Sequence, residues 1–330
     1  RAATSGSQPA AAAESGAPMD IAQANEEFGI AGVLSICAGA GGFPVICIDN
    51  EHAQAEICAY AGQVLSYRPG PEQQDLLFVS EHAHFQPGKA IKGGIPVCWP
   101  WFGPDPEARG RPDHGFVRGR HWRLLATEAM VDGGTRVRLG CRDDEATRAL
   151  WPHPFALEIE VMVGESLDVA LVSRNTGDLP VTITQGLHTY FKVGDVRRVQ
   201  VLGLAGHEYI DKVASIAPDR APADQVDVRV KQSGPINFDG PVNRIYLDTT
   251  GRLIVDDPAL GRQIRIDREG SRSAVVWNPW VVQSQQMGDF GDDEYLGMVC
   301  VETTNAANDA VTVPAGASHR MASRYSIVHD

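Results

Sequence analysis

The chain is divided into short apolar or alternating runs, and glycine, proline, aspartate or asparagine separates most of these runs from the next. From Phe28 onward, apolar residues seldom recur at the spacing of three and four residues that an amphipathic helix requires. Short runs between turn-forming residues are typical of β-strands. The pattern therefore predicts an all-β protein with few short helices.

The runs locate the expected strands, and helical periodicity is confined to two short places. Helix is expected at 143–149, with one further turn after Asp289. The expected strands are 45–48, 56–59, 76–79, 135–141, 156–163, 166–175, 181–187, 199–202, 244–247, 263–266, 273–277, 298–303 and 319–327. No repeat of fixed period is present, which argues against propellers and solenoids. Many strands without a repeat favour one large antiparallel β-sandwich.

The first residues, RAATSGSQPAAAAESGAP, are of low complexity and carry almost no large apolar side chains. Such a segment cannot bury enough surface to order itself, so residues 1–27 are expected to form a disordered tail. Met19 opens a stretch of more ordinary composition and is a candidate start of the protein. No change in composition after Phe28 looks like a linker, and a single domain is expected over 28–330.

Charge and cysteine content limit the partners and the compartment. The formal net charge is −13, from 29 Lys+Arg and 42 Asp+Glu, and it repels nucleic acids and anionic membrane surfaces. No apolar run is long enough to span a membrane. The six cysteines form no CxxC pair and show no zinc-ligand spacing. We expect reduced thiols in a cytoplasmic protein, disulfides being the alternative, and we favour a monomer that binds neither nucleic acid nor membrane.

The segment 88–122 combines glycines, prolines, tryptophans, histidines and arginines in one non-helical stretch. Trp99 and Trp101 flank a proline, which fixes φ and holds the preceding residue extended. On such a backbone the two indoles can present flat apolar faces to a sugar. The alternative is that both tryptophans belong to the core of a large β protein.

Cations are concentrated in the same segment, although the chain as a whole is acidic. Lys92, His114 and Arg118 are candidate donors to a hydroxyl-rich or anionic ligand. The arginines of the segment and its end are Arg109, Arg111, Arg118, Arg120 and Arg123. A small anionic substrate requires a local cluster of this kind to overcome the global charge. The segment therefore favours a carbohydrate ligand, with or without a phosphate.

Two residues further along the chain are candidates for proton transfer. In VTITQGLHTYF, alternation places His188 on the polar face of a strand, with a gap at Gly186 where a ligand could lie. Glu302 interrupts the apolar run MVCVETTN, where an unpaired carboxylate would carry a large desolvation cost. A structural histidine and a buried salt bridge are the alternatives. If both residues face one cleft, they can supply an acid and a base near neutral pH.

Other catalytic patterns are weak or absent from the sequence. His82 and His84 in EHAHF could share one face of a strand as part of a cupin-type metal site, but no third ligand is obvious. There is no GxSxG, GxxxxGK[ST] or HExxH motif, and no cysteine has a nucleophile signature. Serine and cysteine catalysis are therefore set aside.

Several blocks follow one another along the chain: GKAIKGGIPVCWPWFGP, HGFVR, GLHTYFKVGD, RIYLDT, VVWNPW with MGDF, and MVCVET. In these blocks and their order the chain resembles the glucose-6-phosphate 1-epimerases, the hexose-6-phosphate mutarotases of the aldose 1-epimerase superfamily. The resemblance implies a galactose mutarotase-like β-sandwich that interconverts the α and β anomers of a hexose 6-phosphate without a metal or organic cofactor. It also implies that His188 is the general acid and Glu302 the general base.

Three positions depart from the pattern of that family. The resemblance implies substrate contacts at Lys92, Asn243 and Gln283, where arginine, aspartate and lysine respectively are usual, whereas Arg118 and His114 are retained. Lysine lacks the bidentate fork that arginine offers a phosphate. These departures leave two alternatives open. One is a sugar-phosphate-binding sensor without catalysis, and the other is a mutarotase for a neutral aldose.

Overall fold

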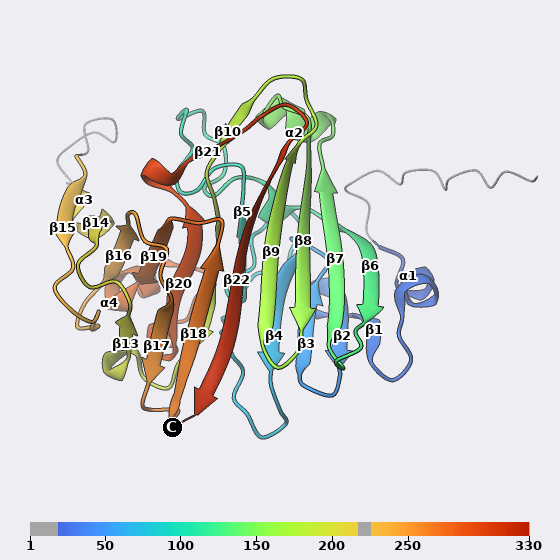
Figure 1. The fold of residues 1–330 in the computed structure, drawn as a ribbon, viewed down its shortest axis with the longest axis horizontal. Coiled ribbons are helices and arrows are strands. Elements are labelled where there is room, and N and C mark those ends of the chain that lie inside the picture. The colour runs from blue at the N-terminus through green and yellow to red at the C-terminus, as the bar shows by residue number, and fades with distance from the viewer. Residues whose placement is uncertain (1–18, 217–225, 330) are drawn as a thin grey trace, which may run out of the picture.

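Two large antiparallel sheets and one smaller sheet form the body of the protein (Figure 1). The computed structural model describes residues 19–216 and 226–329. The first large sheet, here called the site sheet, has eight strands. In spatial order they are β15 (Val228–Lys231), β14 (Glu208–Asp211), β16 (Val242–Tyr246), β19 (Ser273–Asn278), β20 (Met298–Asn305), β11 (Gln185–Leu187) and β5 (Val97–Cys98), with β12 (Tyr190–Lys192) also paired to β20.

The second large sheet, here called the back sheet, also has eight strands. Their order is β13 (Gln200–Leu202), β17 (Leu253–Asp257), β18 (Arg262–Glu269), β22 (Ser318–His329), β9 (Leu167–Asn175), β8 (Phe155–Val163), β7 (Thr135–Arg142) and β6 (Arg123–Ala129). A four-stranded sheet contains β1 (Leu34–Ala38), β2 (Pro44–Asp49), β3 (Gln54–Cys58) and β4 (Gln63–Arg68), and β10 (Val181–Ile183) pairs with β21 (Val311–Val313). All of these pairs are antiparallel, as expected for a β-sandwich with local connections.

Helices are short and lie at the margins of the sheets (Figure 1). The α-helices are α1 (Ile21–Phe28), α2 (Glu145–Leu150), α3 (Lys212–Ser215) and α4 (Trp280–Gln286), and the 3₁₀ turns are Ala40–Gly42, Val117–Gly119, Val196–Arg198, Glu294–Gly297 and Ala307–Asp309. The prediction of an all-β sandwich with few short helices is confirmed. The helix expected at 143–149 and the turn after Asp289 are present as α2 and the turn Glu294–Gly297.

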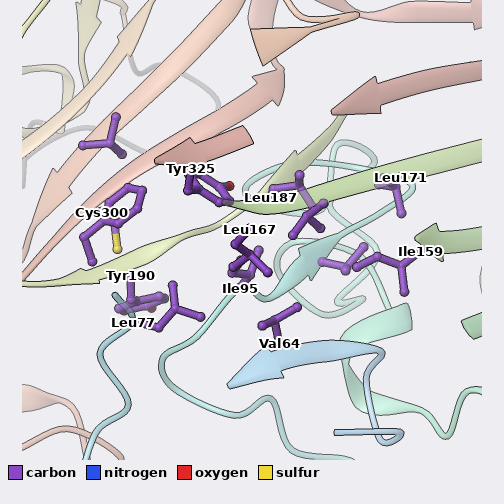
Figure 2. Packing of buried hydrophobic residues seen from close by; sticks show 14 of the residues in the cluster. Val64, Leu77, Ile95, Ile159, Leu167, Leu171, Leu187, Tyr190, Cys300 and Tyr325 are labelled. Atoms are coloured by element: carbon purple, nitrogen blue, oxygen red, sulfur yellow. The ribbon is translucent and has the colours of Figure 1, made fainter. Parts of the chain in front are cut away.

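Strict alternation along β8 shows how the sequence builds the core. In FALEIEVMV, Phe155, Leu157, Ile159, Val161 and Val163 are buried, and the residues between them are half-exposed. Figure 2 shows such side chains packing between the sheets, with Ile159 among those labelled. Each fully buried aliphatic or aromatic side chain contributes about 1.5–3 kcal/mol through removal of apolar surface from water. The hydrophobic pattern thus fixes which face of the back sheet turns inward.

Polar side chains connect the two large sheets through this core. The hydroxyls of Tyr325 on β22 and Thr189 in the site sheet are 2.7 Å apart, and both residues are buried. Arg262 on β18 is also buried, and its guanidinium donates to three backbone carbonyls, one of them on β12 of the site sheet. Its acceptors are the carbonyl oxygens of Gln74, Asp75 and Lys192.

Three expectations from the sequence need correction. The expected strand 181–187 is divided at Thr184, whose amide donates to the carbonyl of Pro100, so β10 and β11 join different sheets. The expected strand 76–79 forms isolated bridges only, at Leu77 and Val79. A tail reaching residue 27 is wrong at its end, because α1 begins after the N-cap Asp20.

The side chain of Asn25 joins helix α1 to β1 of the four-stranded sheet. Its Nδ2 donates to the carbonyl of Ile36, and its Oδ1 accepts from the backbone amide of Ile36. Residues 1–18 of the expected tail lie outside the described residues, and the single domain over 28–330 stays a prediction. In the described part of the chain, no helix is both long and apolar enough to cross a membrane.

Candidate active site

His188 and Glu302 face each other across neighbouring strands. β11 and β12 pair with the same strand, β20, in one continuous register, and only His188 and Thr189 separate them. In that register His188 lies opposite Glu302, and the two side chains share one face of the site sheet. The amide of His188 donates to the carbonyl of Pro96, which continues the pairing of β11 with β5 on the other side of the strand. Nε2 of His188 is 3.5 Å from Oε1 of Glu302.

Burial shifts both of these groups toward their neutral forms. Glu302 is 1% exposed, and burial raises the pKa of its carboxyl well above 4.5, with a smaller opposing effect from Arg118. Burial also lowers the pKa of His188 well below 6.5, and the nearby His114, Arg118 and Lys92 lower it further. Desolvation disfavours the charged form of each group. The pair therefore retains one proton over a wide pH range.

Two buried polar atoms of this pair have no hydrogen-bond partner among the described residues. They are Nδ1 of His188 and Oε2 of Glu302. Buried polar atoms in folded proteins are nearly always paired, since an unpaired one costs about 1–3 kcal/mol. Exceptions of this kind are typical of groups that contact a ligand. Both atoms are suited to accept or donate a proton at a bound hydroxyl.

Aromatic residues and a second histidine enclose the pair. The ring of Tyr190 stacks on His188 with centroids 4.9 Å apart, and Trp277 contacts both rings edge-on. The ring of His114 lies 5.4 Å from that of His188. Nδ1 of His114 accepts from the amide of Gly103 at 3.1 Å, so the proton of the neutral ring resides on Nε2. Burial lowers the pKa of His114 to about 3, which makes it a neutral hydrogen-bond donor.

A cavity lined by cations adjoins Tyr190. Its volume is about 250 Å³, and Lys89, Lys92 and Arg118 line it together with His84. Nζ of Lys92 is 3.6 Å from Oδ1 of Asp289, the one carboxylate in the lining. Three cations against one anion give this cavity a local positive charge in an acidic chain. The cavity can therefore take an anionic group attached to a ligand that occupies the His188–Glu302 pair.

The two other predicted polar contacts, Asn243 and Gln283, lie in different surroundings. Asn243 on β16 pairs with Trp277 on β19, so it shares the face of the site sheet that carries Glu302. Gln283 is exposed on α4 and does not line the cation cavity. Asn243 thus remains a candidate substrate contact. Gln283 is not brought together with the other site residues.

The prediction that Trp99 forms a sugar platform is wrong. Trp99 is 2% exposed, its ring packs against Trp151 and Phe155, and its Nε1 donates to Oγ of Ser173. Trp101 is buried as well. The alternative interpretation of these tryptophans, as core residues, is the correct one. The sequence alone does not show which side of the extended backbone faces the core, and both rings lie on that side.

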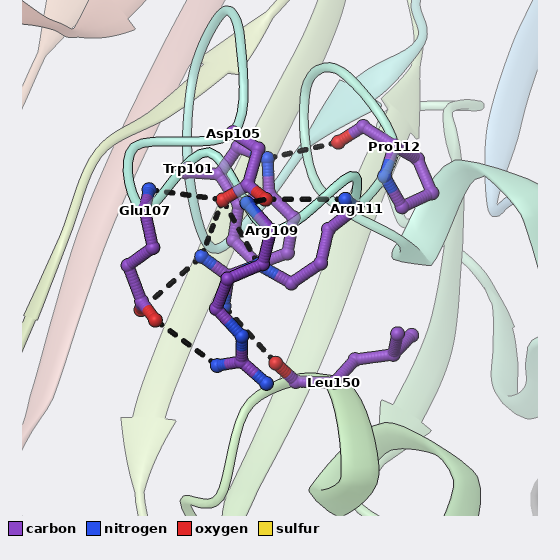
Figure 3. A network of polar contacts seen from close by, with 7 residues as sticks. All are labelled: Trp101, Asp105, Glu107, Arg109, Arg111, Pro112 and Leu150. Carbon is purple, nitrogen blue, oxygen red and sulfur yellow. Dashed lines mark hydrogen bonds and ion pairs between the residues drawn. The ribbon is translucent and has the colours of Figure 1, made fainter.

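Most arginines of the segment 88–122 are paired with acidic residues. Arg111 forms ion pairs with Asp105 and Glu107, as part of the polar network in Figure 3. Its guanidinium also lies 4.3 Å from the centroid of the Trp101 ring. Arg109 pairs with Glu107. Arg120 pairs with Asp144, Arg123 is exposed on β6, and Arg118 donates to the carbonyl of Asp113. Of this cluster, Arg118 is the arginine that lines the cation cavity.

The gap expected at Gly186 is filled by an aromatic side chain. A Cβ at Gly186 would lie 2.8 Å from the ring of Phe102, so glycine is required for this ring to pack there. The same ring contacts His114 edge-on, with centroids 4.9 Å apart. Phe102 therefore fixes the position of His114. Sequence reasoning missed this residue, although it directly follows the tryptophan pair.

One cluster of side chains among the described residues has ligand atoms close enough together to hold a metal ion. Ligand atoms of His188, Cys300 and Glu302 lie within 4.8 Å of one another. Burial raises the pKa of the Cys300 thiol well above 9.0, which disfavours the thiolate that a metal requires. His82 and His84 belong to no such group in the described part of the chain, so the structure offers no third ligand for the cupin-type alternative.

Sequence reasoning also missed two residues that lie beside the His188–Glu302 pair, Trp277 and Cys300. The register could have located them. Cys300 lies opposite both Tyr190 and Trp277 in the site sheet. Once Glu302 is placed, the residue two positions earlier on its strand must share its face.

Comparisons with known proteins agree with this geometry. The sequence model of the family described as Aldose 1-epimerase matches residues 44–326. Proteins named "Putative glucose-6-phosphate 1-epimerase" from Escherichia coli and Cenchrus ciliaris are each 35% identical, over 80% and 81% of this chain and 83% and 79% of their own lengths.

Solved structures show the same fold. The crystal structure of a "putative mutarotase" from Salmonella typhimurium is 30% identical, with a TM-score of 0.80 over 90% of this chain and 94% of that chain. A galactose mutarotase-like protein from Clostridium acetobutylicum, 12% identical, has a TM-score of 0.67 over 90% of this chain and 98% of that chain. At that identity the likeness shows the fold alone. The family model and the relatives together show that the chain belongs to the aldose 1-epimerase family of isomerases.

Proposed function

We propose that the protein interconverts the α and β anomers of a hexose 6-phosphate, with glucose 6-phosphate as the first candidate. This proposal rests on the position of the His188–Glu302 pair beside the cation cavity. Tyr190 stacks on His188 and also lines the cavity. The names of the relatives from Escherichia coli and Cenchrus ciliaris support the choice of substrate.

The spacing of the pair suits a reaction at one carbon atom. The anomeric hydroxyl and the ring oxygen of an aldose are both bonded to C1, so they lie close together. The side chains of His188 and Glu302 approach each other to 3.5 Å, so an acid and a base at this pair can reach both oxygens at once. Glu302 removes the hydroxyl proton while His188 protonates the ring oxygen, and the ring opens to the aldehyde. Rotation about C1–C2 exposes the other carbonyl face, and the reverse transfers close the ring.

The single proton retained by the pair accounts for both directions. The closed sugar requires ionised Glu302 and protonated His188, and the open sugar requires protonated Glu302 and neutral His188. These two states differ only in the position of one proton. Burial favours the neutral state in the free enzyme, because it raises the pKa of Glu302 and lowers that of His188. The enzyme is therefore ready for either anomer without exchanging protons with solvent.

A phosphate in the cation cavity would make the ionised state easier to reach. Arg118 and Lys92 both lower the pKa of His188. A bound phosphate dianion neutralises part of their charge, so the pKa of His188 rises. The phosphate thereby promotes the proton transfer as well as binding. This coupling gives the substrate's remote group a role in the rate, in addition to affinity.

Anomer exchange can be measured by saturation-transfer NMR for glucose 6-phosphate, galactose 6-phosphate and glucose. We expect the fastest exchange with a hexose 6-phosphate, and we expect His188→Ala and Glu302→Gln each to reduce kcat by about 10²–10⁴-fold. Matched controls are His329→Ala and Glu128→Gln, which change exposed residues of the same types. Undiminished exchange in both variants would show that His188 and Glu302 are not the general acid and the general base. Tight binding of glucose 6-phosphate without exchange would instead indicate a sensor.

The expected cellular setting is also a proposal. Six free cysteines support a reducing compartment such as the cytoplasm. A small sugar phosphate is the expected partner, and the working state is expected to be a monomer. Gel filtration with light scattering would test the last point, and a dimer would overturn it.

A further inference from the structure

Two of the six cysteines meet on neighbouring strands, away from the active site. Cys37 lies on β1 and Cys47 on β2, and their Sγ atoms are 2.7 Å apart. In the ladder Cys37 is opposite Val45 and Cys47 is opposite Ser35, so the cysteines are diagonal neighbours on one face. Strand twist brings one diagonal within reach of short side chains. The side chains therefore meet without any change in strand pairing.

This pair is accessible to small molecules, whereas the other cysteines are not. Cys37 is exposed and Cys47 is half-buried. Both line an open groove of about 1290 Å³ beside the four-stranded sheet. The four remaining cysteines, Cys58, Cys98, Cys141 and Cys300, are buried. A reagent in solution can thus reach one thiol directly and find a second thiol in contact with it.

We propose that Cys37 and Cys47 form a dithiol site that a small organic disulfide, such as oxidised glutathione, converts to an intramolecular disulfide. A disulfide requires Cα atoms within about 7 Å and Cβ atoms that point toward each other. The Sγ atoms of Cys37 and Cys47 are already 2.7 Å apart across an intact ladder, so the two side chains point toward each other and the bond needs only a small further approach of the sulfurs. The chemistry is thiol–disulfide exchange, which needs no metal and no oxygen.

The two thiols have different roles in this exchange. The exposed Cys37 loses its proton to solvent, and its thiolate attacks one sulfur of oxidised glutathione and releases glutathione thiolate. Burial, with a smaller effect of contact with Cys37, raises the pKa of Cys47 to about 12, so Cys47 is not the first nucleophile. Cys47 then loses its proton and attacks the Cys37 sulfur, which releases the second glutathione. Two protein thiols are oxidised, and one disulfide is reduced to two thiols.

The test uses the full chain in its folded form. The protein is incubated with oxidised glutathione and then treated with iodoacetamide, first under native and then under denaturing conditions. Before alkylation, the protein incubated with oxidised glutathione should be lighter than the untreated protein by the mass of two hydrogen atoms. Peptide mapping should show Cys37 and Cys47 joined and the four buried cysteines labelled only after denaturation.

Single substitutions separate the two steps. Cys47→Ser should stop at the mixed disulfide and gain the mass of one glutathione at Cys37. Cys37→Ser should remain unmodified, because the half-buried Cys47 is the poorer nucleophile. Cys58→Ser is the matched control, and it should form the same cross-link as the unsubstituted protein. Either a stable glutathione adduct at Cys37 in the unsubstituted protein or alkylation of all six cysteines after oxidation would overturn the proposal.

Discussion

Nε2 of His188 lies 3.5 Å from Oε1 of Glu302 in surroundings that stabilise neither the imidazolium nor the carboxylate. A surface ion pair at this distance would hold two stable charges. Here burial favours the neutral form of each group, and the proposed reaction transfers one proton between them. The arrangement should lower the stability of the fold while supporting catalysis.

Replacement of Glu302 by Gln should stabilise the protein as pH rises. Because the folded-state pKa of Glu302 is raised above 4.5, its contribution to stability is complete below that pH and is lost as pH rises through the folded value. Gln does not ionise, so Glu302→Gln should become progressively more stable relative to the original protein as pH rises above 4.5, beside a constant offset. Urea unfolding across this range measures the difference, with Glu128→Gln as the control. A difference that does not vary with pH would show that Glu302 is ionised and paired.

The pH profile of kcat/KM should have a broad plateau. Activity requires one proton on the pair, and the pair gains a second only when His188 is protonated. Since the pKa of His188 is well below 6.5, the acid limb should lie below pH 6.5. Glucose is the better substrate for this measurement, because a phosphate monoester itself titrates near pH 6. An acid limb at or above pH 6.5 would contradict a desolvated His188.

Phosphate in the cation cavity should raise kcat as well as affinity. Neutral glucose should have a lower kcat than glucose 6-phosphate, and added inorganic phosphite should increase the kcat for glucose. The reason is that an anion beside Arg118 and Lys92 offsets their effect on the pKa of His188. Saturation-transfer NMR with a phosphite titration measures this effect. Inhibition by phosphite with no increase at any concentration would mean that the phosphate contributes binding alone.

Lys92 should contribute to phosphate affinity, and its ion pair with Asp289 should limit that contribution. Lys92→Met should raise KM for glucose 6-phosphate by about 10–100-fold, the loss of one charge-assisted contact, and should leave KM for glucose unchanged. Lys92→Arg and Asp289→Asn should each lower KM for the phosphorylated sugar. The first adds a bidentate fork, and the second removes the carboxylate 3.6 Å from Nζ. Equal effects on both sugars would place Lys92 outside the phosphate site.

Buried residues with a simple pattern were predictable from the sequence. The alternation in FALEIEVMV gave β8, and the carboxylate in MVCVETTN marked Glu302 as a group that needs a special environment. In both cases the decisive physical quantity, burial, is visible in a few adjacent residues. His188 was predicted for a similar reason, although the strand that carries it is divided at Thr184.

Residues whose role depends on distant partners were not predictable. Trp99 looked like a ligand platform because its neighbours are prolines and glycines, but Ser173 and Phe155 on the back sheet receive it in the core. Phe102 looked unremarkable because its partner, Gly186, is far away in the sequence. In both cases the contact that decides the role comes from another sheet or another part of the chain.

The register of β11, β12 and β20 has a consequence for how such a protein can change over time. Because the register of these strands places His188 opposite Glu302, the distance between the proposed acid and base is set by strand pairing and not by the segments between the strands. Insertions or deletions in those segments can reshape the sugar-binding walls while the reacting atoms keep their separation. A lineage can therefore acquire a new substrate without rebuilding its proton-transfer chemistry.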